Sequence, residues 1–152
     1  MASDKKGDMA GATDQWNYAD VWEWIADRFG DEPALVHGDT ARSWREFDRR
    51  AAGIAEVLLH AGLGRQEKVA QYCRNRPEYI ETIFACFKAS LVPVNTNFRY
   101  GPEELAYLWA DSETAAVVFD AEFTDNCDQL RKQLPRIKAW IHVGEDDCPP
   151  WA

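Results

Sequence analysis

The sequence lacks the features that mark several common classes of protein. It has no apolar run of about 18 residues, so no transmembrane helix is expected. Its first fourteen residues contain no apolar core of the kind found in secretory signal peptides. Basic residues are in deficit, with 17 Lys and Arg against 26 Asp and Glu and a formal net charge of −9. Nucleic acid is therefore not an expected partner, because neutralising phosphates requires a surface of Lys and Arg.

Cysteine is also sparse, and its spacing excludes two further kinds of site. The 4 cysteines form no Cys-x-x-Cys pair and have no histidine at metal-ligand spacing; they stand at Cys73, Cys86, Cys127 and Cys148. The sequence therefore predicts neither a metal site nor a disulfide framework. We expect reduced thiols, mostly packed as small hydrophobic groups, in a cytoplasmic protein.

Motifs that would locate a catalytic centre are missing as well. The sequence has no Gly-x-x-x-x-Gly-Lys-[Ser/Thr] phosphate loop and no Gly-x-Ser-x-Gly nucleophile motif. Gly62 and Gly64 begin like a dinucleotide-binding loop, but Glu67 stands at the third glycine position. We interpret Gly62 as a helix stop. A flavodoxin-like nucleotide-binding domain is therefore the least favoured of the hypotheses for this chain, because it would need a phosphate loop. No residue is assigned a catalytic role.

The residues that are present indicate a single folded domain. Of the 152 residues, 46% are hydrophobic and 12% aromatic, which is enough for a buried core. Residues 1–15 are mostly small and polar, and we expect them to form a disordered N-terminal tail. Residues 16–152 are expected to form the folded part.

Helix and strand patterns alternate along the folded part. Apolar residues recur at helical spacing over 18–29, 47–58, 80–87, 105–109 and 123–134. Strands are predicted at 34–37 and 40–43, joined as a hairpin, and at 68–73, 91–94, 115–119 and 139–143. Gly30 is interpreted as a helix stop, and Ser43 with Glu46 as a capping box. This order predicts an α/β fold, with a mostly parallel sheet flanked by helices after an N-terminal helix and β-hairpin.

One loop stands out as a candidate site. Residues 95–101 follow an apolar strand and precede a helix, and such loops gather around the ligand crevice of a parallel sheet. Arg99 within this loop is suited to contact a phosphate, because its planar guanidinium matches phosphate oxygens. From the residues alone, an ion pair of Arg99 with Glu103 or Glu104 is the alternative.

Taken in order, several stretches resemble the N-terminal part of acyl-CoA synthetases, which belong to the adenylate-forming AMP-binding enzymes. The matching stretches are 31–36, 43–49, 68–70, 75–79, 84–95, 103–108 and 111–112. The pattern looks most like that of bacterial fatty-acyl or steroid-acid CoA ligases. Ser90 and Phe98 depart from it, because the family usually has glycine and proline there. A serine at position 90 is costly if the backbone needs a positive φ.

The resemblance implies a partial N-terminal subdomain of the adenylate-forming ligase fold. It also implies an enzyme that activates a fatty or steroid-type carboxylic acid with ATP and Mg to an acyl-adenylate, and then transfers the acyl group to CoA. Arg99, in the stretch Asn97-Phe98-Arg99, is implied to contact a CoA phosphate in the intact enzyme. The substrates of that enzyme, a carboxylic acid and CoA, are the partners we expect.

The resemblance also implies what is missing. Family members are several times longer and carry a Ser/Thr/Gly-rich phosphate loop ending in Pro-Lys, followed later by a C-terminal domain with a catalytic lysine. Neither is in this sequence. We therefore expect an N-terminal fragment that is inactive alone and binds ATP, CoA and Mg poorly. The alternative is a non-catalytic α/β interaction or regulatory module derived from such a ligase.

Overall fold

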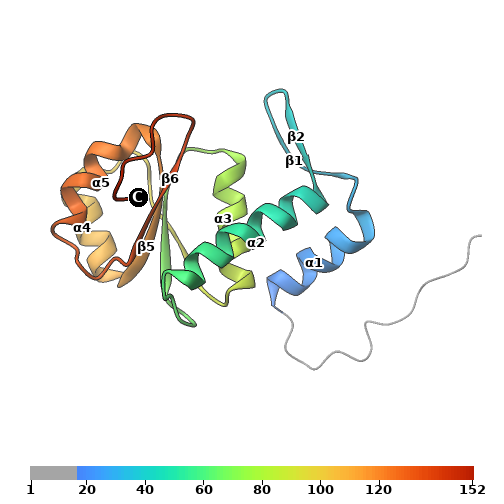
Figure 1. Cartoon of the computed structure of the whole chain (residues 1–152), viewed down its shortest axis with the longest axis horizontal. Helices are drawn as coiled ribbons and strands as arrows, with labels where there is room; N and C mark the ends of the chain where they lie inside the picture. The colour runs from blue at the N-terminus through green and yellow to red at the C-terminus, as the bar shows by residue number, and fades with distance from the viewer. Residues whose placement is uncertain (1–16) are drawn as a thin grey trace, which may run out of the picture.

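A computed structural model describes residues 17–152 (Figure 1). The tail predicted at 1–15 lies outside the described residues. In chain order the elements are α1 (Tyr18–Phe29), β1 (Pro33–His37), β2 (Thr40–Ser43), α2 (Trp44–His60), β3 (Lys68–Tyr72), α3 (Pro77–Lys88), β4 (Val92–Asn95), α4 (Pro102–Asp111), β5 (Thr114–Asp120), η1 (Ala121–Phe123), α5 (Thr124–Arg131) and β6 (Ala139–Val143). Over residues 17–152, no helix is long and apolar enough to cross a membrane.

The main sheet has four strands in the order β4-β3-β5-β6, and all three pairings are parallel. Strands β1 and β2 form a separate antiparallel hairpin, which stands out from the rest of the molecule (Figure 1). The structure therefore confirms the α/β class, the parallel sheet and the N-terminal helix and hairpin. A parallel pair needs a crossover connection, and the helices between the strands supply it.

Helices cover both faces of the sheet. Helices α4 and α5 pack on one face, where Leu105 and Leu130 meet Val117 of β5. Helices α2 and α3 pack on the other face, where Leu58 and Cys86 join a second buried cluster. Strand β5 is buried along its whole length, as the continuous apolar run predicts for a strand covered on both sides.

Helix α1 adds a further layer over α2 and α3 (Figure 1). An aromatic group joins these helices: the Trp22 ring lies 5.6 Å from Phe47 and 5.0 Å from Phe84, measured between ring centroids. Aromatic pairs at this spacing add to the stabilisation from burial.

Two predicted helix ends differ in detail from the structure. Gly30 has a helical φ of −52°, so no special backbone angle requires glycine there. A Cβ at Gly30 would lie 2.8 Å from the Ala26 carbonyl oxygen, so glycine is required by close approach instead. The Ser43 hydroxyl accepts a hydrogen bond from Glu46 N at 3.3 Å, which is one half of the predicted capping box. A complete box caps α1, where Asn17 and Asp20 bond each other's backbone N–H.

The end of α3 shows why serine at position 90 is unusual. Ser90 has a φ of +56°, the left-handed region that favours glycine. The next residue, Leu91, donates its N–H to the Cys86 carbonyl at 2.7 Å and closes the helix. The expected cost of a serine at this position therefore applies. Gly62 has a φ of +80° after α2, which confirms it as a helix stop.

Candidate functional site

The carboxyl ends of the parallel strands form the candidate site. In the sheet, β3 lies between β4 and β5, and the chain leaves β3 through α3 to reach its neighbour β4. From β5 the chain runs through α5, on the opposite face, to β6. Open α/β sheets bind ligands in the crevice where the connections diverge in this way. Here that crevice lies between the ends of β3 and β5.

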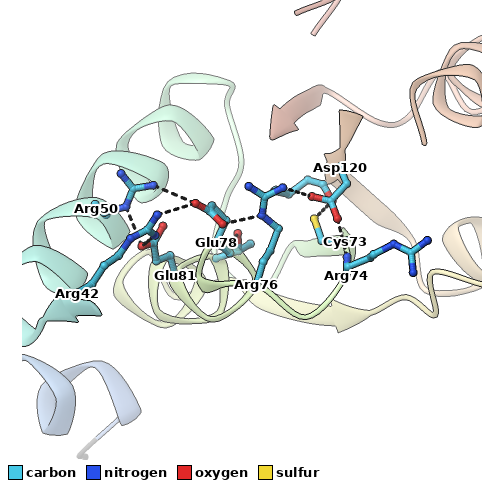
Figure 2. A network of polar contacts seen from close by, with 10 residues as sticks. Arg42, Arg50, Cys73, Arg74, Arg76, Glu78, Glu81 and Asp120 are labelled. Carbon is cyan, nitrogen blue, oxygen red and sulfur yellow. Dashed lines mark hydrogen bonds and ion pairs between the residues drawn. The ribbon is translucent and has the colours of Figure 1, made fainter. Parts of the chain in front are cut away.

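Asp120 bridges this crevice. It ends β5 and is 4% exposed. Its carboxylate accepts a hydrogen bond from Arg74 N at 2.6 Å and another from Arg76 Nη1 at 2.8 Å (Figure 2). Both donors follow β3. Asp120 therefore ties the ends of the two central strands together.

A chain of ion pairs continues from Arg76 towards the N-terminal layer (Figure 2). Glu78 on α3 accepts from Arg76 Nε at 2.7 Å and from Arg42 Nη2 at 2.8 Å. Glu81, one turn further along α3, accepts from Arg42 and from Arg50 Nε, the latter at 2.7 Å. The Glu81 side chain is fully buried. The network therefore connects the sheet to β2 and α2 through two glutamates of α3.

The charges around Glu78 control its protonation. Burial raises the pKa of Glu78, but hydrogen bonds from Arg42 and Arg76 outweigh burial and lower that pKa to about 2. A carboxyl group whose pKa is depressed in the folded state stabilises that state at pH values above its unfolded pKa. The contribution of Glu78 is therefore fully present above its ordinary value of 4.5 and is lost as the pH falls through about 2.

Glu78→Gln is expected to make stability less dependent on pH. The variant should lose stability at about pH 7, and the difference from the unmodified protein should shrink at about pH 3, where Glu78 is already mostly protonated in the unfolded chain but still ionised in the folded protein. Urea unfolding at both pH values measures the difference. Glu103→Gln, at an exposed position on α4, is the control. An equal loss for Glu78→Gln at both pH values would contradict the expectation.

A polar cleft of about 710 Å³ lies between the hairpin and the carboxyl edge of the sheet. His37 and Arg42 line one side, and Arg74, Arg76 and Glu145 line the other. All three arginines make ion pairs with carboxylates of this chain. Their charges are already balanced, so the cleft does not offer a cationic site for a phosphate.

Arg99 is placed differently. It is exposed in the loop between β4 and α4, where its backbone N–H donates to Asn97 Oδ1 at 3.0 Å. Within residues 17–152, no carboxylate lies at ion-pair distance from its guanidinium. Glu104 instead accepts from Gly101 N at 2.6 Å and caps α4. The alternative of an ion pair with Glu103 or Glu104 is therefore wrong, and the guanidinium faces solvent.

Phe98 connects the Arg99 loop to the end of β3. The Arg99 guanidinium carbon lies 5.4 Å from the centroid of the Phe98 ring, and that of Arg74 lies 4.8 Å from it. Arg74 also forms a two-point ion pair with Glu122, at 2.5 and 2.9 Å. Phenylalanine, which departs from the usual proline of the resembled family, thus supplies a contact between the loop and the sheet.

Buried groups hold the same loop from beneath. Trp109 Nε1 donates to the buried Thr96 hydroxyl at 3.2 Å. The Tyr72 hydroxyl donates to the Tyr100 carbonyl at 3.0 Å and accepts from Asn126. Arg99 is therefore a solvent-facing cation on a loop that is fixed at both ends.

The cysteines provide no nucleophile at the site. Cys73, Cys86 and Cys127 are buried, as predicted for small hydrophobic groups, and Cys148 is exposed. Burial raises the pKa of Cys86 to about 12 and raises those of the other two buried thiols still further. These thiols stay protonated at neutral pH.

The sequence offers Arg99 as a candidate phosphate contact, which stays a prediction, but it did not indicate the ion-pair network. The only available signal was the order of Arg74, Arg76, Glu78 and Glu81, in which two basic residues are followed by two carboxylates one helical turn apart. The partners Arg42 and Arg50 stand 28 to 39 residues earlier.

Comparison with known proteins places these features in context. The family model described as "AMP-binding enzyme" matches residues 22–151. A medium/long-chain-fatty-acid–CoA/3-oxocholest-4-en-26-oate–CoA ligase of Mycobacterium marinum is 33% identical over 127 residues, which are 84% of this chain and 23% of the relative. Medium-chain acyl-CoA ligase Mig of Mycobacterium avium is 28% identical over 151 residues, which are 91% of this chain and 28% of the relative.

Solved structures share the fold. A fatty acyl CoA synthetase of Mycobacterium tuberculosis superposes with a TM-score of 0.77 at 22% identity, covering 84% of this chain and 26% of that one. A benzoate CoA ligase of Burkholderia xenovorans superposes with a TM-score of 0.76 at 18% identity, covering 86% of this chain and 26% of that one. The chain thus spans about a quarter of the length of the relatives it matches. Because the family model covers most of the chain, this protein belongs to the AMP-binding enzyme family.

Proposed function

We propose that this chain is the N-terminal portion of an acyl-CoA ligase. The complete enzyme would activate a fatty or steroid-type carboxylic acid with ATP to an acyl-adenylate and then transfer the acyl group to CoA. The names of the relatives support this proposal, because the M. marinum relative is named as a ligase of both fatty acids and a steroid acid. Within this proposal, residues 16–152 are a truncated part of one AMP-binding domain.

The observation that carries the proposal at residue level is the free guanidinium of Arg99. It stands at the carboxyl edge of the sheet, on a loop held by Trp109 and Tyr72. A fixed and unpaired arginine binds phosphate without first giving up a carboxylate partner. Arg99 is thus the residue of this portion that would contact a phosphate of CoA.

ATP and Mg require groups that this sequence does not supply. It contains no Ser/Thr/Gly-rich phosphate loop, and the three arginines of the cleft are already paired. Adenylate formation depends on donors and cations positioned around the transferred phosphoryl group. The chain alone is therefore expected to bind ATP poorly and to form no acyl-adenylate.

Arg99→Ala tests the assigned contact in a full-length ligase that carries this portion. Charged hydrogen bonds contribute about 1.5–3 kcal/mol, so the KM for CoA should rise roughly tenfold or more. Adenylate formation, measured as pyrophosphate exchange, should stay nearly unchanged. Arg65→Ala is the matched control. Arg65 is also exposed, but it precedes β3 and so lies at the amino ends of the strands, away from the carboxyl ends where Arg99 stands. Unchanged CoA kinetics in Arg99→Ala would contradict the role.

A further inference from the structure

The ring of Phe98 contacts two guanidinium groups at the carboxyl edge of the sheet. The guanidinium carbon of Arg74 lies 4.8 Å from the ring centroid, and that of Arg99 lies 5.4 Å from it. Both distances are within the range of about 6 Å over which an aromatic ring attracts a guanidinium. Phe98 is itself partly buried and packs against the core cluster under α4 and α5. One side chain therefore touches the core, the end of β3 and the cation of the loop.

Arg74 gives this ring a fixed support. Its backbone N–H donates to the buried Asp120 carboxylate, and its guanidinium makes the two-point ion pair with Glu122. Glu122 also balances the charge of Arg74, which reduces the repulsion between the two guanidinium groups that share the ring. The position of the Phe98 ring is therefore defined both by the core and by the end of β3.

Arg99 has a fixed backbone but a long and flexible side chain. Asn97 holds the turn, because its side-chain oxygen accepts from Arg99 N and its carbonyl accepts from Tyr100 N, both at 3.0 Å. These bonds do not restrain the guanidinium, which stands at the end of several rotatable bonds. Within the described part of the chain, the Phe98 ring is the partner that restrains it.

We propose that Phe98 is a positioning residue whose ring holds the Arg99 guanidinium where a phosphate of CoA would meet it. This inference rests on the proposed function. An arginine that is already restrained loses less conformational freedom on binding, and for one such side chain the difference corresponds to about threefold to tenfold in affinity. The proline expected here from the family pattern has no aromatic ring and could not restrain the arginine in this way.

Side-chain NMR spectra of the intact chain test the positioning without any ligand. A proton over an aromatic ring is shifted upfield by the ring current, so the Arg99 side-chain signals should be shifted in the unmodified chain. Phe98→Leu keeps an apolar side chain against the core but removes the ring. This shift should then be lost, and the Arg99 Nε–H bond should become more mobile on the ps–ns timescale. Phe98→Tyr keeps the ring and should keep the shift.

Kinetics with CoA test the consequence in a full-length ligase that carries this portion. Phe98→Leu should raise the KM for CoA about threefold to tenfold, and Phe98→Tyr should restore it. Adenylate formation, measured as pyrophosphate exchange, should stay nearly unchanged, whereas a loss of folding would lower both half-reactions together. Tyr107→Leu is the matched control, because it removes a ring that is 72% exposed on α4 and should change neither the KM nor the Arg99 signals.

Three results would overturn the role of Phe98. These are Arg99 signals that do not change in Phe98→Leu, a KM for CoA that rises in Arg99→Ala but not in Phe98→Leu, and a failure of Phe98→Tyr to restore either readout. The second of these would leave the proposed function intact. Loss of the ring-current shift in Phe98→Leu, with an unchanged KM in both Phe98→Leu and Arg99→Ala, would support the hold of Phe98 on Arg99 and contradict the proposed function.

Discussion

Glu81→Ala is expected to destabilise the protein by about 3 kcal/mol or more, because breaking a buried ion pair leaves uncompensated charge in the interior. Glu81 is fully buried, whereas Arg42 and Arg50 are 14% and 35% exposed and both donate to the same carboxylate oxygen. Without Glu81, both guanidiniums must rely on Glu78, which already accepts from Arg76. Urea unfolding followed by circular dichroism measures the loss.

Glu81→Gln separates charge from volume at this position. It keeps the size of the side chain but removes the negative charge, so it should retain most of the destabilisation. If Glu81→Ala instead stays within about 1 kcal/mol of the unmodified protein, the network contributes little net stability. A double-mutant cycle with Arg50→Ala then measures the coupling between the two side chains.

Trp109→Ala is expected to cost about 3–5 kcal/mol, the usual range for truncating a buried aromatic residue. Trp109 is 1% exposed, and its ring centroid lies 5.8 Å from that of Tyr72 and 5.8 Å from that of Trp140. The substitution also removes the donor to Thr96 at the start of the Arg99 loop. Thermal and urea unfolding should both register the loss.

Two controls define the origin of the Trp109 effect. Trp109→Phe keeps most of the packing but loses the hydrogen bond to Thr96, so its cost should be clearly smaller than that of alanine. Tyr107→Ala removes an aromatic ring that is 72% exposed on the same helix and should change stability by no more than about 0.5 kcal/mol. Similar losses of stability for Tyr107→Ala and Trp109→Ala would contradict the conclusion that burial of Trp109 in the core stabilises the protein.

The fold class was predictable because its signals are local. The apolar run at 115–119 predicts a strand buried on both faces, and β5 is buried from Thr114 to Asp120. The helical spacing from Tyr18 to Phe29 likewise matches α1. Both patterns depend on residues that are close in sequence, so no knowledge of the tertiary structure is needed.

The charged network was not predictable for the opposite reason. A glutamate in a helix is normally exposed, and nothing near Glu81 in the sequence indicates burial. Its burial depends on Arg42 and Arg50, which reach it only after β2 and α2 pack against α3. Pairs such as Arg74 and Glu122, 48 residues apart, are formed by the tertiary fold in the same way.

The Arg99 loop lies between these two cases. Its position after a strand and before a helix was enough to place Arg99 at the carboxyl edge. Its state of pairing was not predictable, because Glu104 could serve either Arg99 or the start of α4. The structure shows that capping Gly101 N takes the carboxylate away from the arginine.

The strand order has a consequence for how the chain folds. The central pair of the sheet joins β3 to β5, so Lys68–Tyr72 meets Thr114–Asp120 only after α3, β4 and α4 have been made. During synthesis β3 can pair with β4 alone, and its other edge stays open until residue 120 has emerged. Such non-local pairing slows folding and lengthens the time for which an apolar strand edge is exposed to other chains. The step that completes the centre of the sheet is thus also the step that ends its greatest exposure to aggregation.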